Sequence, residues 1–300
     1  MADSATGRRG FVRASWANVL GNTVKIIVEG AAGLAFGSVA LLADAAHSIA
    51  DLVASVVVLV WGRSSFDEPD DTHPHGHDRI EPLTALFVGS VIAVLGLILL
   101  VESLQGLVEL DPPDATPLLL GALAFAIVDM YLVYRYTEYV NADIGSTALS
   151  ALAADCLNDI YTSIAATVGV LGVLLNVPIL DPIAGGLVSL LVIYQGIKIG
   201  RENVTYLVGA AASSEKRTEI TRTLRDHPAV EGVHDLTVFY DGTVLEVEVH
   251  VEVDGNMPFR QAHDIESDLV DQLRAIEDVG DAHVHLDPSG IGEWKERPDD

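Results

Sequence analysis

Two pairs of ionisable residues stand inside long apolar segments of this 300-residue chain. His47 and Asp51 are four residues apart in one segment, and Asp155 and Asp159 are four residues apart in another. Residues at this spacing share one face of a helix. One imidazole and three carboxylates can together enclose a divalent metal ion tetrahedrally. The alternative is two unrelated polar pairs that line a water-filled cavity, but their matching depth in two segments favours one shared metal site.

Other polar residues in the apolar segments are expected to support this site. Lys25 and Glu29 are four apart in the first segment, where an internal ion pair is the favoured interpretation. For Asp129, a structural role facing away from the cytoplasm is the default. Four residues are expected to contact the ion or its water, to form the outer vestibule, or to hydrogen-bond the ligands: Asn22, Asp44, Asn158 and Thr162.

A short acidic segment after the second apolar run, EPDDTHPHGHDRIEP, concentrates further metal ligands. It places Asp70, His73, His75 and His77 within eight residues, a density that suits zinc or a neighbouring transition metal. The alternative is a solvated acidic loop, and His75 fits that interpretation best.

The last third of the chain holds most of the remaining histidines. They are spread over expected strands and a helix, so scattered surface histidines are an equally good interpretation of the pattern alone. The candidates are His234, His250, His263, His283, His285 and Asp287.

The hydropathy pattern divides the chain near residue 210. Before it, six apolar runs reach or approach the length of about 20 residues that crosses a bilayer. They cover 14–36, 39–62, 83–108, 117–138, 147–176 and 181–200, and the first run is too long for a signal peptide. After residue 210, helical spacing at 214–226 and 258–275 alternates with strand patterns at 233–240, 243–253 and 281–287.

These patterns predict an α-helical membrane protein of six transmembrane helices followed by a soluble α-β-β-α-β domain. The expected parts are a 1–13 cytoplasmic segment, a 14–209 transport domain, a 210–290 cytoplasmic domain and a 291–300 tail. Residues 1–10 and 290–300 are expected to be disordered. Basic residues lie before the first apolar run, between the second and third runs, and at the end of the fourth: Arg8, Arg9, Arg13, Arg63, Arg79 and Arg135. Because basic residues favour the cytoplasmic side of a membrane, both termini are expected in the cytoplasm.

The charge balance narrows the function classes further. With 17 basic and 43 acidic residues, the net charge of −26 disfavours nucleic-acid binding, which needs a basic surface. Residues 210–300 alone hold 22 acidic and 8 basic residues. A surface rich in Asp and poor in Lys is typical of salt-adapted proteins, in which ions screen the repulsion. A single cysteine excludes an intramolecular disulfide scaffold.

The motifs resemble those of the cation diffusion facilitator family, over residues 14–288. GSVALLADAAHSIAD, DDTHPHGHDRIE and AADCLNDIYTS occur in the family's order, followed by GVHDL, VEVHVEV, RQAHDIE and HVHLDP. The resemblance implies a homodimeric metal/proton antiporter in the cell membrane, with a metallochaperone-like cytoplasmic domain. It assigns His47, Asp51, Asp155 and Asp159 to the transport site, and Asp70, His73 and His77 to the loop site. It assigns His234, His250, His263, His285 and Asp287 to a binuclear site at the dimer interface.

The expected function is export of a divalent transition metal, with Zn²⁺ as first choice and Fe²⁺, Mn²⁺, Co²⁺ or Cd²⁺ as alternatives. Carboxylates and imidazole bind metal only when deprotonated, so metal and protons compete for the same groups. An inward proton gradient then drives the metal out. The rival interpretation is a membrane-anchored metal sensor or scaffold without transport. An enzyme is disfavoured, because the chain has no His-Glu-x-x-His motif and no visible nucleophile with a base.

Overall fold

The computed structural model describes residues 4–36, 39–67, 69–109, 117–177 and 179–290, without the side chains of residues 4–5, 33, 35–36, 39–47, 50, 109, 117–118, 173 and 181. The chain forms two compact units, Met1–Val204 and Thr205–Asp300, which are treated separately below. The order of helices and strands confirms the predicted fold class, a helical membrane domain followed by an α-β-β-α-β domain.

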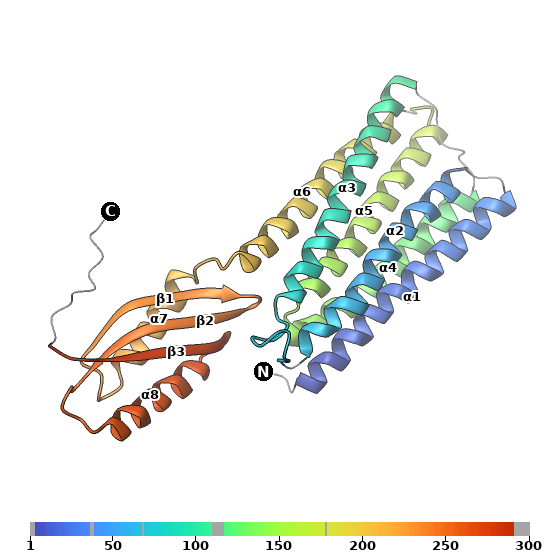
Figure 1. Ribbon diagram of the computed structural model, residues 1–300. Helices are drawn as coiled ribbons and strands as arrows, with labels where there is room; N and C mark the ends of the chain where they lie inside the picture. Colours follow the sequence, from blue (N-terminus) through green and yellow to red (C-terminus); the bar gives the residue numbers. More distant parts are fainter. Residues whose placement is uncertain (1–3, 37–38, 68, 110–116, 178, 291–300) are drawn as a thin grey trace. The chain divides into compact units, whose positions relative to one another are not determined.

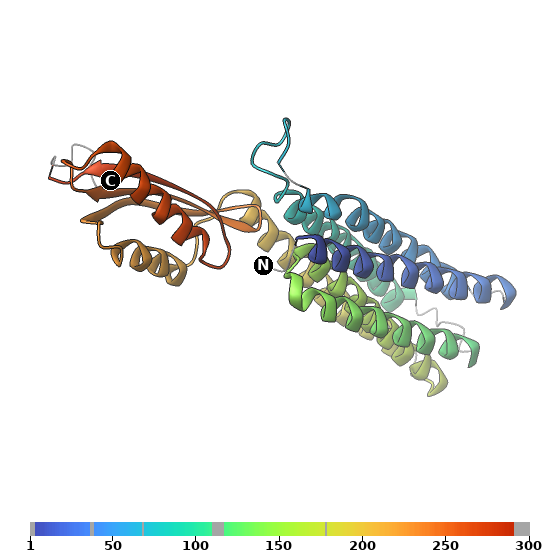
Figure 2. The same ribbon diagram turned by 90° about the horizontal axis from the view of Figure 1, so that it is seen from below.

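The first unit is built from long helices that run side by side (Figure 1, Figure 2). Helix α1 packs against α2, α4 and α5, helix α5 also packs against α2 and α4, and α3 packs on α2 and α5. Three helices are long and apolar enough to cross a membrane within the described residues, over Ile80–Val108, Leu119–Ile144 and Pro182–Leu207. The helices are α1 (Ser4–Phe36), α2 (Val39–Trp61), α3 (Ile80–Glu109), α4 (Pro117–Ile144), α5 (Thr147–Leu174) and α6 (Leu180–Leu207), with a 3₁₀ turn η1 (Gly62–Phe66) after α2.

The polarity of this unit is inverted relative to a water-soluble protein. Large apolar side chains such as Leu97, Leu132 and Leu187 are exposed on its outer surface. Polar and charged side chains are buried between the helices instead. An apolar exterior of this extent fits contact with lipid rather than with water. The buried polar residues of α1, α2 and α5 include Asn18, Asn22, Lys25, Glu29, Ser48, Asp51, Ser55, Asp155, Asn158, Asp159 and Ser163.

The amino-terminal segment differs from the sequence-based expectation. The disorder predicted for residues 1–10 is wrong from Ser4 onward, because α1 begins there. Phe11 is fully buried and stacks on Phe66, with ring centroids 5.5 Å apart. The guanidinium of Arg8 lies 3.2 Å from the carboxylate of Asp67. These contacts to the turn after α2 stabilise helical turns that hydropathy alone does not predict. Residues 291–300 lie outside the described residues.

The second unit is a three-stranded sheet with both helices on one face (Figure 1). Strand β1 (Gly232–Asp241) pairs antiparallel with β2 (Val244–Val253), which pairs parallel with β3 (Val279–Pro288). Helix α7 (Ser214–Arg225) precedes the sheet, and α8 (Phe259–Arg274) connects β2 to β3. Ser213 caps α7 by accepting a hydrogen bond from the backbone N–H of Lys216.

Strict alternation along β2 decides which face of the sheet is covered. Leu245 and the valines at 247, 249, 251 and 253 point into the core, where they meet Ile220 and Leu224 of α7 and Leu269 and Leu273 of α8. The intervening residues Glu246, Glu248, His250 and Glu252 therefore share the other face of the sheet. Asp281, His283, His285 and Asp287 alternate in the same way along β3.

The crowding of carboxylates on the uncovered face predicts a strong salt dependence of stability. We expect the thermal midpoint of a 210–300 fragment to rise as salt increases from about 0.1 M to about 3 M, because the Debye length falls from about 10 Å to below about 3 Å. Calorimetry at a series of salt concentrations measures the midpoint. The Glu248→Gln variant removes one exposed charge from this face and should flatten the dependence. A wild-type midpoint that does not change with salt would contradict the salt-adapted interpretation.

Candidate metal sites

Three aspartates are buried between the helices of the first unit. Asp51 on α2 is 1% exposed, and Asp155 and Asp159 on α5 are 6% and 5% exposed. The charges of all three act on the thiol of Cys156, which is buried beside them on α5. Three carboxylates held away from lipid are costly, so by default they mark an ion pathway. The side chains of His47 and Asp44 lie outside the described part of the structure, and their roles stay predictions.

A buried lysine contacts one of these aspartates. The Nζ atom of Lys25 on α1 lies 3.1 Å from Oδ1 of Asp159, and both side chains are almost fully buried. The charge of Lys25 also acts on Asp155. The sequence favoured a local pair of Lys25 with Glu29, and no spacing rule could find the partner on α5. The four-carbon stem of lysine lets the ammonium reach across the helix interface.

The carboxylates are not gathered into a compact ligand group. Three sets of potential ligands in the described residues have atoms within 4.8 Å of one another, and the aspartates of α2 and α5 are not among them. Like charges repel at short range in a medium of low dielectric constant, and the Lys25 ammonium takes up one carboxylate oxygen. In this structure an ammonium group, and not a metal ligand, lies beside Oδ1 of Asp159.

Two asparagines present unused polar atoms in this region. Asn22 donates from Nδ2 to the hydroxyl of Ser55 at 3.2 Å, while its Oδ1 has no hydrogen-bond partner among the described residues. Neither Oδ1 nor Nδ2 of buried Asn158 has such a partner. Buried polar atoms without partners are costly, which fits a role toward an ion or its water. Thr162 departs from the expectation, because its hydroxyl donates to the backbone carbonyl of Asp159 rather than to a carboxylate.

Asp129 on α4 also belongs to this region, which the sequence did not indicate. The charges of Lys25 and Asp159 both act on its carboxyl group, and its Oδ2 is buried without a hydrogen-bond partner among the described residues. The only signal in the sequence was an isolated acid within an apolar run. The spacing of residues on α4 could not reveal neighbours that come from α1 and α5.

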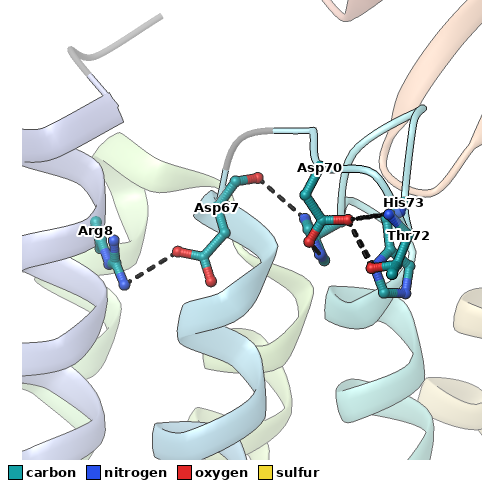
Figure 3. A network of polar contacts seen from close by, with 6 residues as sticks. Arg8, Asp67, Asp70, Thr72 and His73 are labelled. Carbon is teal, nitrogen blue, oxygen red and sulfur yellow. Dashed lines mark hydrogen bonds and ion pairs between the residues drawn. The ribbon is translucent and has the colours of Figure 1, made fainter.

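The segment between α2 and α3 forms a second ligand group (Figure 3). Ligand atoms of Asp70, His73 and His77 lie within 4.8 Å of one another. The carboxylate of Asp70 is 3.4 Å from Nδ1 of His73 and 3.6 Å from Nε2 of His77. Nδ1 of His77 lies 3.3 Å from the backbone carbonyl of Asp67, which holds the ring in place. His75 is exposed and is not part of this group.

Local hydrogen bonds keep the Asp70 carboxylate ionised. Its Oδ1 accepts the hydroxyl of Thr72 at 2.7 Å and the backbone N–H groups of Thr72 and His73 at 2.8 Å and 2.6 Å. These bonds, the Thr72 hydroxyl first, lower the pKa of Asp70 from 3.8 to about 2. A carboxylate with a lowered pKa loses its charge only when the pH falls through that value. The carboxylate of Asp70 is therefore ionised at physiological pH and available as an anionic donor.

We expect Asp70→Asn to weaken Zn²⁺ binding to this segment by at least about tenfold. The ratio of wild-type to variant affinity is compared at about pH 7, where the carboxylate of Asp70 is ionised. Titration calorimetry in a His250→Ala/His285→Ala background measures it. Asp71→Asn is the matched control, since Asp71 neighbours the group without belonging to it. Equal affinities of the two variants would contradict the predicted ligand set.

A third ligand group lies on the uncovered face of the sheet. Strand register places His234 opposite His250 and His250 beside His285. Oδ2 of Asp287 is 2.8 Å from Nδ1 of His250 and 3.5 Å from Nε2 of His234. Among the described residues, the buried Nε2 of His234 has no hydrogen-bond partner, and it faces the carboxylate of Asp287.

We call His234, His250 and Asp287 the sheet group. Two further predicted ligands, His285 and His263, are not members of this compact group. Nε2 of His285 is 3.2 Å from the second carboxylate oxygen of Asp287, so it adjoins the group. His263 on α8 is exposed and pairs with Glu266 at 3.2 Å, and the structure does not bring it to the sheet group within one chain. The interface role that the resemblance gives His263 stays a prediction.

The structure also shows a ligand group that the sequence did not predict. Glu246, Asp281 and His283 have ligand atoms within 4.8 Å of one another, with Oε1 of Glu246 3.0 Å from Nε2 of His283. The parallel register places Glu246 beside Asp281, and a sequence does not reveal that register. Asp281 is also bound by the Arg274 guanidinium. Partial burial of Asp281 opposes ionisation, but the bonds to Arg274 and to the backbone outweigh it and lower the pKa of Asp281.

Comparison with known proteins covers both units. Residues 15–208 match the family model for a cation efflux transmembrane domain, and residues 212–289 match the one for the cytoplasmic domain of cation efflux proteins. The manganese efflux system protein MneS of Bacillus subtilis is 26% identical over 89% of this chain and 90% of its own length. Metal tolerance protein C1 of Arabidopsis thaliana is 31% identical, over 88% of this chain and 59% of its own length.

A third relative is the cation-efflux pump FieF of Salmonella newport, 28% identical over 85% of each chain. The two matched models together span both structural units, in the order in which these units occur. The chain belongs to the cation diffusion facilitator family of cation-efflux transporters.

Proposed function

We propose that this protein exports divalent transition-metal cations across the cell membrane in exchange for protons, with both termini in the cytoplasm. The observation that carries the proposal is the burial of Asp51, Asp155 and Asp159 between helices whose outer surface is apolar. His47, one turn before Asp51, is proposed as the fourth ligand and as the proton acceptor nearest in ordinary pKa to the working pH.

The chemistry of these ligands supports coupling of metal to protons. Each carboxylate binds metal only in its ionised form, so a metal ion and protons exclude each other from the site. Facing the cytoplasm, the deprotonated site takes up the ion. Facing the outside, it meets a more acidic solution, takes up protons and releases the ion. Alternating exposure of one site therefore converts the proton gradient into export of metal.

Zn²⁺ is the first-choice substrate, because one imidazole with carboxylates suits a tetrahedral zinc ion. Mn²⁺, Fe²⁺, Co²⁺ and Cd²⁺ are the alternatives, and three carboxylates shift the donor set toward harder ions such as Mn²⁺. The name of MneS gives manganese as the cargo of that relative, which supports including it. We also propose a homodimer in which metal at the sheet group of the cytoplasmic domain regulates transport.

A metal sensor without transport is the second candidate function. The compact sheet group of His234, His250 and Asp287 favours it, since this group is closer to coordination geometry than the buried aspartates. Reconstituted protein distinguishes the two functions. Zn²⁺, Mn²⁺, Fe²⁺, Co²⁺ and Cd²⁺ are offered separately to proteoliposomes, and entry is followed with a metal-sensitive dye. A transporter accumulates at least one ion above protein-free vesicles, whereas a sensor binds metal without flux.

A further inference from the structure

The buried lysine of α1 stands where a metal transporter needs anionic ligands. Lys25 is 1% exposed, and lysine is almost never fully buried unless it is paired. Its Nζ atom lies 3.1 Å from Asp159, which is one of the proposed metal ligands. An ammonium group and a divalent cation cannot both occupy the space next to one carboxylate oxygen without strong repulsion. Binding of metal to Oδ1 of Asp159 therefore requires the ammonium to leave that oxygen.

An alternative acceptor for the ammonium lies within its electrostatic reach. Asp129 on α4 is influenced by the charge of Lys25, and its Oδ2 is buried without a hydrogen-bond partner among the described residues. An unsatisfied buried acceptor costs free energy, so a hydrogen bond from an ammonium group would stabilise it. Helix α1 packs on α4, and α4 packs on α5, so the three side chains come from adjacent helices. The four-carbon stem of lysine is flexible, which lets its ammonium group change partners.

We propose that Lys25 is a resident cation of the transport site. The ammonium holds Asp159 while the site lacks metal, and it moves to Asp129 when a divalent ion takes Asp159. This inference rests on the proposed function, because it assigns Asp159 to the metal. It makes Lys25 a positioning residue that competes with the substrate.

This competition has a use in transport. A site with three carboxylates and no compensating charge would bind a divalent cation tightly and release it slowly. The ammonium opposes metal binding in every orientation of the site, so it lowers the affinity and speeds release. Removal of the lysine charge should therefore strengthen binding and slow turnover, whereas loss of a merely structural residue should not strengthen binding.

The test measures metal affinity and transport kinetics in full-length protein that carries Asp70→Asn, His250→Ala, His283→Ala and His285→Ala to silence the three other ligand groups. In Lys25→Gln we expect Zn²⁺ affinity to rise by about tenfold, with both KM and kcat of transport lowered. Lys25→Arg keeps the charge and should stay within about threefold of the parent protein. Lys198→Gln is the matched control, because Lys198 is an exposed lysine of α6.

A second variant keeps the proposal testable if Lys25→Gln does not fold. Asp129→Asn removes the alternative acceptor, so it should weaken Zn²⁺ binding by about tenfold, and this effect should vanish in the Lys25→Gln background. Unchanged or weaker affinity in folded Lys25→Gln overturns the proposal, as does unchanged affinity in Asp129→Asn. Failure of the proposed function looks different, since Asp51→Asn would then bind and transport metal like the parent protein.

Discussion

Replacing Asp51 or Asp155 by asparagine is expected to reduce metal transport to the background of protein-free vesicles. Each residue is nearly fully buried and is proposed as one of three anionic ligands. Without it, the attraction of the remaining ligands is too weak to offset the free energy of desolvating a divalent cation. Asparagine has almost the same volume as aspartate, which preserves packing. Metal entry into proteoliposomes, normalised to the amount of reconstituted protein, measures the effect.

Two controls make this loss interpretable. Asp143→Asn changes an exposed carboxylate at the end of α4 and should transport like wild type. Asp159→Asn is a less clean variant, because it leaves the ammonium of Lys25 buried without this carboxylate, and such changes cost about 3–5 kcal/mol of stability. The double variant Lys25→Gln/Asp159→Asn should recover most of that stability. Near wild-type flux in both Asp51→Asn and Asp155→Asn would exclude these aspartates as metal ligands.

The second large effect is expected at the sheet of the cytoplasmic domain. His250→Ala with His285→Ala should abolish high-affinity Zn²⁺ binding to the sheet group while transport persists at high metal concentration. His250 provides the closest contact to Asp287, at 2.8 Å, and His285 approaches the other oxygen of that carboxylate. Their loss leaves one imidazole and one carboxylate, which is too few ligands for tight binding.

Titration of Zn²⁺ into full-length protein with and without these substitutions measures the loss. His227→Ala is the matched control, because His227 pairs with Asp268 and lies outside the ligand groups of the second unit. Cross-linking with and without Zn²⁺ tests whether bound metal brings two protomers together. Complete loss of transport in a His250→Ala/His285→Ala protein that still dimerises would contradict a regulatory role.

The periodicity of apolar residues predicted the helices and strands of both units, because the polarity of each residue decides which side of a helix or strand is buried. The alternation VLEVEVHVEV could form only a strand with one covered face, and Val247 and His250 lie on opposite faces as expected. The spacing of Asp155 and Asp159 likewise places both on one side of α5. The early start of α1 was missed because it depends on tertiary contacts of Arg8 and Phe11.

The candidate site was less predictable, because its charges are shared among helices far apart in the sequence. The pair of Lys25 with Glu29 stays a prediction, and spacing along α1 could not reveal the contact of Lys25 with Asp159 on another helix. Asp129 gave no pattern at all, since its neighbours Lys25 and Asp159 belong to α1 and α5. The group of Glu246 and His283 required the register of two parallel strands, which depends on the packing of α8 and not on local spacing.

The most direct test of metal–proton exchange is uphill transport driven by a proton gradient alone. Proteoliposomes are loaded with acidic buffer and diluted into neutral buffer that contains the same free Zn²⁺ concentration, with valinomycin and potassium clamping the membrane potential. Exchange of protons for metal predicts that wild-type vesicles accumulate Zn²⁺ above the external concentration, that a protonophore abolishes this accumulation, and that Asp51→Asn vesicles show none. Equilibration of Zn²⁺ to equal concentrations, at a rate independent of the pH gradient, would contradict the exchange mechanism.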